Sequence, residues 1–192
     1  ITQRPLSLSG SRAYDSTRTA SGSDLSFTNI VSGETLGLTG SGVLDSPAAG
    51  TRTIVNTNTL AISDGSGIAS NYTLTNGTLT MTIVPISTTV SGTKTYDGTT
   101  NVASSNLTSF SNLAGSDTLS LSGTGTISSA DVGTGKTVNT SGLTIDNSSG
   151  VGSNYTLSAA TVNVTERVIG LNGVRAFDGT NNASSADLSI SN

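Results

Sequence analysis

Apolar and polar residues alternate along most of the chain, with Ser, Thr, Gly and Asn between the apolar positions. The apolar residues of this pattern are Leu6 and Leu8, Leu36 and Leu38, Leu60 and Ile62, Tyr72 and Leu74, and Leu79, Met81 and Ile83. A period of two gives a strand one face for a core and one for water. Turn-forming clusters at 64–67 and 147–150 punctuate these segments. No capped segment has apolar residues at helical spacing, so the pattern predicts an all-β chain with minimal helix.

The composition favours solvated β-sheet over a disordered tail. Only 10% of the residues are charged and 4% are aromatic, and the formal net charge is −4. Disordered segments combine high net charge with few β-branched residues, whereas Thr, Val and Ile are frequent here. Thr suits a half-exposed strand because its methyl group packs while its hydroxyl stays in water.

An internal repeat is the strongest signal in the sequence. The block Gly10–Thr17 recurs at Gly92–Thr99 and again at Gly173–Thr180, at spacings of 82 and 81 residues. A second block, Ser70–Leu74, recurs 83 residues later at Ser153–Leu157. Segments between these blocks also match in order, so chance similarity does not explain the series. The one-residue change in spacing predicts a loop insertion near Ser116.

The period of about 82 residues predicts tandem β-sandwich-like domains strung end to end. We expect repeat 1 at residues 1–85, repeat 2 at residues 86–166, and the start of a third repeat at residues 167–192. A continuous β-solenoid is the alternative, but its coils usually repeat every 20–30 residues or so.

The connection between the repeats has no flexible Gly/Ser linker. Strand-like residues 78–84 run through Pro85 directly into strand-like residues 86–90. A short connection limits bending, and the fixed φ of proline stiffens it further. We therefore expect a semi-rigid, elongated rod. The 167–192 segment is too short to bury a core alone, so we expect an excerpt of a longer chain or a segment completed by a neighbour.

The repeat resembles the YDG domain of very large secreted bacterial proteins, the filamentous-haemagglutinin-like adhesins. The residues that carry the resemblance lie in repeat 2, at Lys94–Thr99, Val132–Val138, Gly142–Thr144 and Asn154–Leu157. Repeat 1 departs from the pattern with Ser16 in place of Gly and Arg52 near a Lys position. The resemblance implies an extracellular location at the bacterial cell surface and a role as stalk.

The Tyr-Asp-Gly motif has two interpretations, a turn or a ligand site. Its copies are Tyr14 and Asp15; Tyr96, Asp97 and Gly98; and Phe177, Asp178 and Gly179. In the favoured interpretation the aromatic ring plugs a core and the Asp side chain accepts backbone N–H bonds. Ser16 suggests that this position does not demand a positive φ. The alternative is a cation site on the aspartates, but calcium takes about six to eight oxygens and no run of closely spaced acids occurs.

The second recurring motif pairs Asn71 with Tyr72 and Asn154 with Tyr155. We expect both tyrosines in cores and both asparagines in Asx-type turns. These asparagines also lie in Asn-x-Ser/Thr sequons, so glycosylation is the alternative.

The basic residues of the first motif, Arg12, Lys94 and Arg175, are expected to be solvated strand charges. An intramolecular Lys–Asn isopeptide bond is disfavoured because the two lysines of the chain, Lys94 and Lys136, both lie in repeat 2.

The residue types present give little support to catalysis. The sequence has no Cys and no His, which removes thiolate chemistry and the usual base of a catalytic triad. The acidic residues are spread singly, so we expect no enzyme, no cofactor and no metal site. Without a basic patch or an apolar run of about 20 residues, we expect neither nucleic-acid binding nor membrane insertion in this segment.

Two classes of function stay open, a structural stalk and a binding module. A stalk or filament would hold a distal adhesive region, and its partners would be neighbouring repeats of the chain or neighbouring copies. In the alternative, the repeats bind host or cell-surface glycans or proteins themselves, or polymerise into an extracellular fibre. Glycan sites usually expose aromatic rings, whereas most aromatics here occupy repeat-equivalent, core-like positions. This distribution favours the stalk.

Overall fold

The computed structural model describes residues 2–191, so the outer limits of the expected domains, Ile1 and Asn192, lie outside the described residues. Among residues 2–191 the regular elements are strands and short 3-10 helices, with no α-helix. The prediction of an all-β chain is confirmed. No helix in this range is long and apolar enough to cross a membrane.

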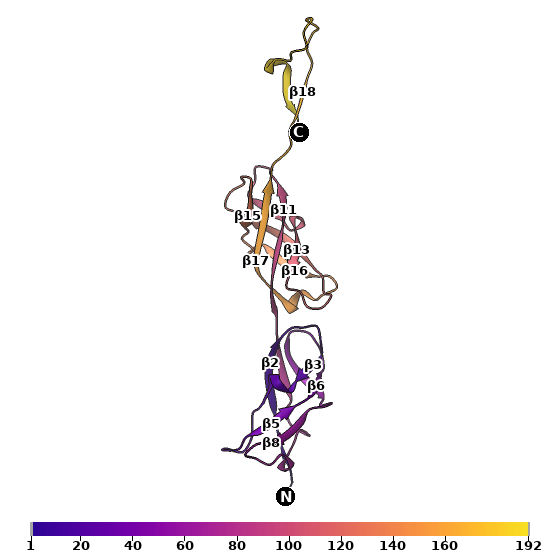
Figure 1. Ribbon diagram of the computed structural model, residues 1–192, viewed down its shortest axis with the longest axis vertical. Coiled ribbons are helices and arrows are strands. Elements are labelled where there is room, and N and C mark those ends of the chain that lie inside the picture. Colours follow the sequence, from indigo (N-terminus) through magenta and orange to yellow (C-terminus); the bar gives the residue numbers. More distant parts are fainter. Residues whose placement is uncertain (1, 192) are drawn as a thin grey trace.

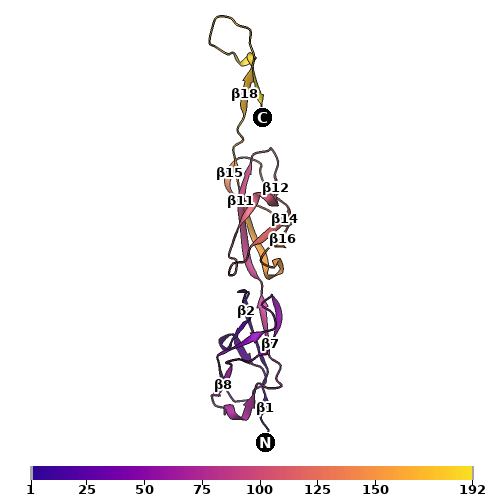
Figure 2. The same cartoon turned by 90° about the vertical axis from the view of Figure 1, so that its right-hand side faces the viewer.

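The molecule is a thin rod. Figure 1 shows two β-structured bodies and a terminal hairpin strung along one axis, with the chain start at one end and the hairpin at the other. The view turned by 90° is equally narrow, so the shape is not a flat plate seen edge-on (Figure 2). The predicted elongated tandem arrangement is therefore present.

Repeat 1 contains ten strands. They are β1 (Arg4–Pro5), β2 (Leu8–Ala13), β3 (Thr19–Ser21), β4 (Leu25–Phe27), β5 (Leu36–Thr39), β6 (Ser41–Leu44), β7 (Gly50–Asn56), β8 (Ala61–Asp64), β9 (Tyr72–Thr73) and β10 (Thr80–Val84). A six-stranded sheet has the order β3-β6-β7-β10-β2-β4, and β5 pairs with β8 and β1 with β9. The short 3-10 helices η1 (Gly22–Asp24) and η2 (Ala69–Asn71) precede β4 and β9.

Repeat 2 has seven strands and divides them between two sheets, whereas the main sheet of repeat 1 continues through the β6–β7 pairing. They are β11 (Ile86–Thr95), β12 (Asn101–Ala103), β13 (Leu107–Ser111), β14 (Leu119–Thr126), β15 (Gly133–Thr137), β16 (Leu143–Asn147) and β17 (Tyr155–Thr165). One sheet has the order β13-β11-β17-β15 and the other β12-β14-β16. The 3-10 helices η3 (Ser104–Asn106) and η4 (Gly152–Asn154) precede β13 and β17. Pro85 alone separates β10 from β11.

In each repeat the first long strand pairs in parallel with the last. β2 pairs with β10, and β11 pairs with β17 over its whole length, from Ile86 opposite Tyr155 to Thr95 opposite Thr165. The chain therefore enters a repeat and leaves it on two adjacent central strands.

The change in repeat spacing arises inside a strand. In repeat 1, Gly10, Ser9 and Leu8 face Leu25, Ser26 and Phe27 in turn. In repeat 2 the equivalent series faces Leu107, Ser109 and Phe110, so Thr108 is an extra residue that forms a β-bulge. The predicted loop insertion near Ser116 is therefore wrong. A bulge absorbs one residue without changing either flanking face, which explains why the sequence pattern hides it.

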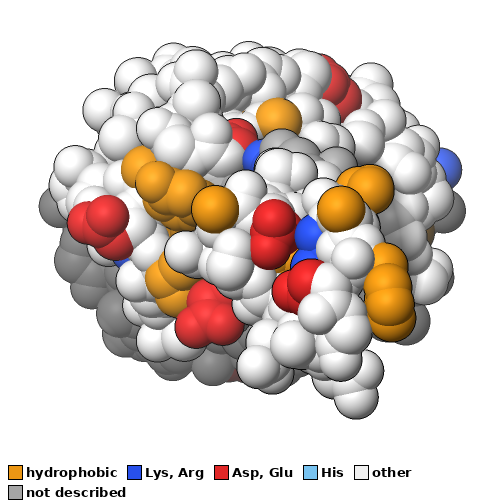
Figure 3. Space-filling view, turned by 90° about the horizontal axis from the view of Figure 1, so that it is seen from above, with side chains coloured by type: hydrophobic (Ala, Val, Ile, Leu, Met, Phe, Trp, Pro, Cys, Tyr) orange, Lys and Arg blue, Asp and Glu red, His pale blue; other side chains and the backbone are white. Residues whose placement is uncertain are grey.

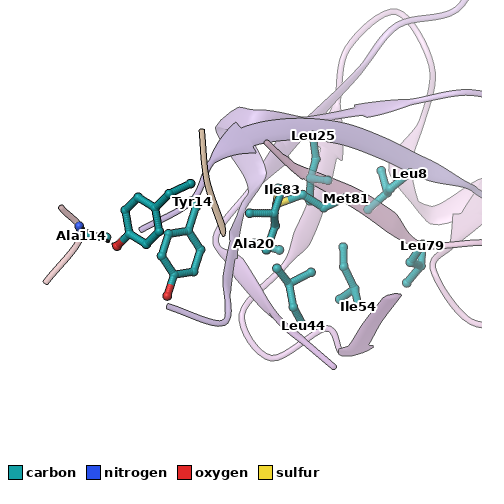
Figure 4. Close-up of a cluster of buried hydrophobic side chains, with 11 residues drawn as sticks. Leu8, Tyr14, Ala20, Leu25, Leu44, Ile54, Leu79, Met81, Ile83 and Ala114 are labelled. Atoms are coloured by element: carbon teal, nitrogen blue, oxygen red, sulfur yellow. Dashed lines mark hydrogen bonds between the residues drawn. The ribbon is translucent and has the colours of Figure 1, made fainter. Parts of the chain in front are cut away.

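Each repeat closes a core of its own between its two layers. The repeat 2 core contains Val90, Leu107, Ala160, Val162 and Val164 from one sheet, Val102 from the other, and Val138 and Ile127 just beyond the ends of β15 and β14. The repeat 1 core contains Leu8, Ala20, Leu25, Leu44, Ile54, Leu79, Met81 and Ile83, drawn in Figure 4. Two closed cores give tandem two-layer domains in place of the alternative solenoid.

The third segment forms only a hairpin. β18 (Gly170–Gly173) pairs with β19 (Leu188–Ser191), and η5 (Ser185–Asp187) precedes β19. Val168, Val174 and Phe177 are each more than 90% exposed. Every buried hydrophobic residue lies between Leu6 and Val164, so repeats 1 and 2 hold both cores of the described chain.

Candidate functional site

The Tyr-Asp-Gly motif forms the same turn in all three copies. Asp97 Oδ1 accepts hydrogen bonds from the backbone N–H and the Oγ1 hydroxyl of Thr99, both at 2.9 Å. Asp15 and Asp178 accept the equivalent pairs from Thr17 and Thr180. One carboxylate oxygen thus closes an Asx turn, as the structural interpretation of the motif requires.

A basic residue three positions earlier braces each turn. Lys94 is only 4% exposed, and its Nζ lies 2.8 Å from Asp97 Oδ1. The same ammonium donates to the carbonyls of Thr99 (2.8 Å) and Asn101 (2.5 Å). The equivalent ion pairs are Arg12 with Asp15 and Arg175 with Asp178. The expectation of solvated strand charges is wrong, because the turn carbonyls and the aspartate together replace the water around each cation.

These contacts shift the acidity of the aspartates. The hydrogen bond from Lys94, with that from the Thr99 N–H, lowers the pKa of Asp97 to about 2. Arg175 lowers the pKa of Asp178 in the same way. Burial works against ionisation of Asp15, but hydrogen bonds from Thr17 and the charge of Arg12 keep its pKa below the ordinary value.

The residue after each aspartate has a left-handed backbone. Its φ is 76° at Gly98, 79° at Gly179 and 62° at Ser16. The inference that Ser16 excludes a positive φ is therefore wrong: serine adopts the strained conformation that glycine adopts freely. The Asx turn fixes this geometry, and residue identity at a single copy does not reveal it.

Tyr14 directly follows β2 and points out of repeat 1 toward repeat 2. Its ring meets that of Tyr155 edge to face, with 5.6 Å between ring centroids and 77° between planes. The two side chains are 6% and 5% exposed. Figure 4 shows Tyr14, and Ala114 of repeat 2, at one edge of the repeat 1 cluster. The repeat 1 core therefore continues across the joint into repeat 2.

Asp117 links the two rings. Its Oδ2 accepts hydrogen bonds from the hydroxyl of Tyr14 at 3.0 Å and from that of Tyr155 at 2.7 Å. The Ala114 N–H donates to the Tyr155 hydroxyl at 3.1 Å. Both bonds are charge-assisted, because the acceptor is a carboxylate.

Asn154 makes a second contact across the joint. Its Oδ1 accepts the N–H of Ala49, in repeat 1, at 2.8 Å. The side chain is 2% exposed and bonds the neighbouring repeat, so the predicted local Asx turn at Asn154 is wrong. A buried amide oxygen needs a donor, and here the preceding repeat supplies it.

Burial raises the pKa of Tyr155 to about 12, although the hydrogen bond from Ala114 opposes the shift. Burial and the bond to Asp117 also raise the pKa of Tyr14. Both phenols therefore stay protonated and donate to Asp117 at neutral pH.

Repeat 1 carries the counterparts of these residues at its end away from repeat 2. Val31, Glu34, Asn71 and Tyr72 each lie 83 positions before Ala114, Asp117, Asn154 and Tyr155. The Tyr72 hydroxyl donates to Glu34 Oε2, and the 31–34 turn closes with a 3.0 Å backbone bond, as the 114–117 turn does. That contact with Glu34, with burial, raises the pKa of Tyr72.

We call Ala114, Asp117, Asn154 and Tyr155 the filled socket, and Val31, Glu34, Asn71 and Tyr72 the open socket. All four residues of the open socket line a pocket of about 360 Å³, together with Thr2, Gln3, Arg4 and Ser70. Val31 is 43% exposed there, whereas its counterpart Ala114 is 8% exposed.

Comparison with family models finds the YDG domain twice, over residues 2–81 and over residues 77–163. The chain belongs to the YDG domain family. Its YDG matches follow the two structural repeats and confirm that these repeats are YDG domains. Comparisons with curated proteins and with solved structures find no match.

The YDG aromatics differ in their surroundings. Tyr14 lies in the joint, whereas Tyr96 is 40% and Phe177 94% exposed. The interpretation of this ring as a plug in the core of its own repeat is therefore wrong: the following YDG repeat buries it. Tyr72 and Tyr155 are buried as expected.

Sequence reasoning missed Glu34, Asp117 and Ala49. The signal was present for the two acids, since both stand at one position of the 83-residue alignment of the YDG repeats. Ala49 contributes through its backbone N–H, which leaves no trace in residue identity. Among residues 2–191, no three His, Cys, Asp or Glu side chains are grouped as metal ligands.

Proposed function

We propose that this chain is a stalk segment of a secreted bacterial surface adhesin, in which the joint between YDG repeats keeps the rod stiff. One observation carries the proposal: the buried contact of Tyr14, Tyr155 and Asp117 joins two repeats that are already closed domains. A joint with its own packing and shared hydrogen bonds resists bending, whereas two domains on a bare linker rotate freely.

The way the molecule uses its aromatic residues supports a stalk over a glycan-binding module. Tyr14, Tyr72 and Tyr155 are buried at repeat ends, and their hydroxyls are bonded to acids. Rings used in this way are not free to stack on sugars. Seen along the rod from the hairpin end, apolar side chains form small separate groups among polar ones (Figure 3).

Small-angle scattering on residues 3–165 tests the stiff joint. This segment retains every buried hydrophobic residue, so both cores are complete. We expect the scattering of one straight rod, and Tyr14→Ala should broaden the distribution of end-to-end distances. Tyr96→Ala is the matched control, because it removes the equivalent ring from a position outside the joint. A compact particle, or identical scattering from both variants, would contradict the proposal.

Binding assays test the stalk against the binding module. The same segment, offered to cells and to a glycan panel, should show no saturable binding. Saturable binding that Tyr14→Ala leaves intact would make the repeats themselves adhesive and would overturn the assignment of this segment as stalk.

A further inference from the structure

We propose that Arg52 is a positioning residue for the joint, because it holds a loop of repeat 1 so that the Ala49 N–H meets Asn154 of repeat 2. The inference rests on the stalk function proposed above and deepens it, since it names the residue that secures a second side of the joint. The contact concerned lies inside the chain, between two repeats that each have a core of their own.

Arg52 binds the loop of residues 45–49 through its carbonyl oxygens. The Nε of Arg52 donates to the carbonyl of Ala48 at 2.7 Å, and its Nη2 donates to the carbonyl of Ala49. A guanidinium presents its N–H groups in a rigid, planar fork. Two bonds from one fork therefore fix both the position and the direction of these neighbouring carbonyls.

The direction of the Ala49 N–H follows from the position of the Ala48 carbonyl. In a trans peptide, the C=O of one residue and the N–H of the next point in opposite directions. Since Arg52 draws the Ala48 carbonyl toward itself, the Ala49 N–H points away from Arg52. Asn154 Oδ1 accepts this N–H at 2.8 Å, from a side chain that is 2% exposed. Arg52 thus aims a backbone donor at the buried acceptor of repeat 2.

The two contacts of the joint lie on opposite sides of the connecting strand. β10 leads through Pro85 into repeat 2, and within its sheet it lies between β2 and β7. Tyr14 follows β2, which is the neighbour of β10 on one side. Ala49 precedes β7, whose first residue, Gly50, pairs with Ile83 of β10 on the other side. The ring contact therefore resists opening of the joint on the β2 side, and the loop contact resists opening on the β7 side.

Repeat 2 has the same device with a lysine. Lys136 stands opposite Val162 of β17, as Arg52 stands opposite Met81 of β10. Its Nζ donates to the carbonyl of Ser129 at 3.0 Å. Lysine holds a carbonyl as a single flexible charge and lacks the planar fork. Arg52→Lys should therefore keep part of the positioning.

Amide hydrogen exchange of the 192-residue chain, followed by NMR, tests the proposal because each contact has a reporter amide. The Ala49 N–H reports the loop contact, and the Ala114 N–H, bonded to the Tyr155 hydroxyl, reports the ring contact. Arg52→Met should speed exchange at Ala49 about tenfold, as expected for the loss of one hydrogen bond. Exchange at Ala114 should stay unchanged, and Arg52→Lys should restore part of the protection at Ala49.

Two controls separate positioning from general stability. Lys136→Met removes the equivalent cation outside this joint and should leave exchange at Ala49 unchanged. The Ile54 N–H bonds the Leu79 carbonyl at 2.9 Å inside repeat 1 and reports the stability of that repeat. If Arg52→Met speeds exchange at Ile54 as much as at Ala49, Arg52 only stabilises repeat 1 and the proposal is wrong. Unchanged exchange at Ala49 would overturn it equally.

A double variant tests whether Arg52 acts through Asn154. Asn154→Ala alone should speed exchange at Ala49, and adding Arg52→Met should give no further increase, whereas additive increases would contradict positioning. Should Arg52→Met not fold, Arg52→Lys replaces it, and a rate at Ala49 outside the range between the parent chain and Asn154→Ala would count against the proposal.

Failure of this inference is distinguishable from failure of the proposed function. If Arg52→Met leaves Ala49 protected while Tyr14→Ala still broadens the scattering distribution, the stiff stalk stands and only the role of Arg52 is wrong.

Discussion

Repeats 1 and 2 contain the same socket in two states. In repeat 2 the ring of Tyr14 packs against it, and Ala114 is 8% exposed; in repeat 1 none of residues 2–191 supplies such a ring, and Val31 is 43% exposed. The residues that recur in each repeat thus serve a contact between repeats more than the interior of one. Whether a recurring ring is buried depends on the repeat that follows it.

Removing the ring of Tyr14 or of Tyr96 should give the largest difference in unfolding free energy between the two repeats. Tyr14→Ala empties the filled socket, and truncating a buried aromatic of this size costs about 3 kcal/mol of unfolding free energy. Tyr96→Ala removes a half-exposed ring and should cost less than about 1 kcal/mol. Urea denaturation of residues 3–165 measures both. Equal losses would show that Tyr14 gains nothing from the joint.

Replacing the acid of each socket should give the second largest difference in unfolding free energy. Asp117 accepts two phenol hydroxyls and Glu34 accepts one. Since hydrogen bonds to charged groups contribute about 1.5–3 kcal/mol, Asp117→Asn should destabilise by about 2 kcal/mol and Glu34→Gln by less. Asp24→Asn, at an exposed acid, is the control for loss of charge alone. A greater loss at Glu34 would reverse the comparison.

Exchanging glycine and serine at positions 16 and 98 should give smaller changes in stability, of opposite sign. Ser16 and Gly98 share a positive φ, and a Cβ at Gly98 would meet no atom within 4 Å. At Gly98 the cost of a side chain is therefore backbone strain alone, which amounts to about 1 kcal/mol. Ser16→Gly should stabilise and Gly98→Ser destabilise by about that much, as thermal unfolding would measure. Destabilisation by Ser16→Gly would mean that the Ser16 side chain contributes to the joint.

The last prediction concerns alkaline pH and involves no change in stability at neutral pH. Because the pKa of Tyr155 rises from 10.0 to about 12, its contribution is complete below pH 10 and is lost as pH rises toward 12. Tyrosinate absorbance should therefore show phenols titrating above the ordinary range, together with the opening of the joint. Tyr14→Ala should lower the pKa of Tyr155 by admitting water. An unchanged titration in that variant would contradict the shared burial.

The sequence predicted the strands and the repeat well, because alternation and collinear motifs are local signals. The prediction failed where the environment of a residue depends on contacts that its own identity does not show. Lys94 has the sequence pattern of an exposed strand charge, but its ammonium is buried because it donates to the carbonyls of Thr99 and Asn101. Asn154 has the sequence pattern of a turn residue, but its side chain accepts the N–H of Ala49 in the preceding repeat. The backbone at Ser16 is set by Asp15, and serine itself gives no hint of it.

The parallel pairing of first and last strands decides how a pulled molecule responds. Tension applied along the rod would draw β11 toward one end and β17 toward the other. The ladder between them, from Ile86–Tyr155 to Thr95–Thr165, would be loaded along its length. Its hydrogen bonds would then have to break together in shear, whereas a hairpin pulled from its open end unzips one bond at a time. Repeat 2 would then resist the pull as a unit, and the shorter β2–β10 ladder would make repeat 1 yield first.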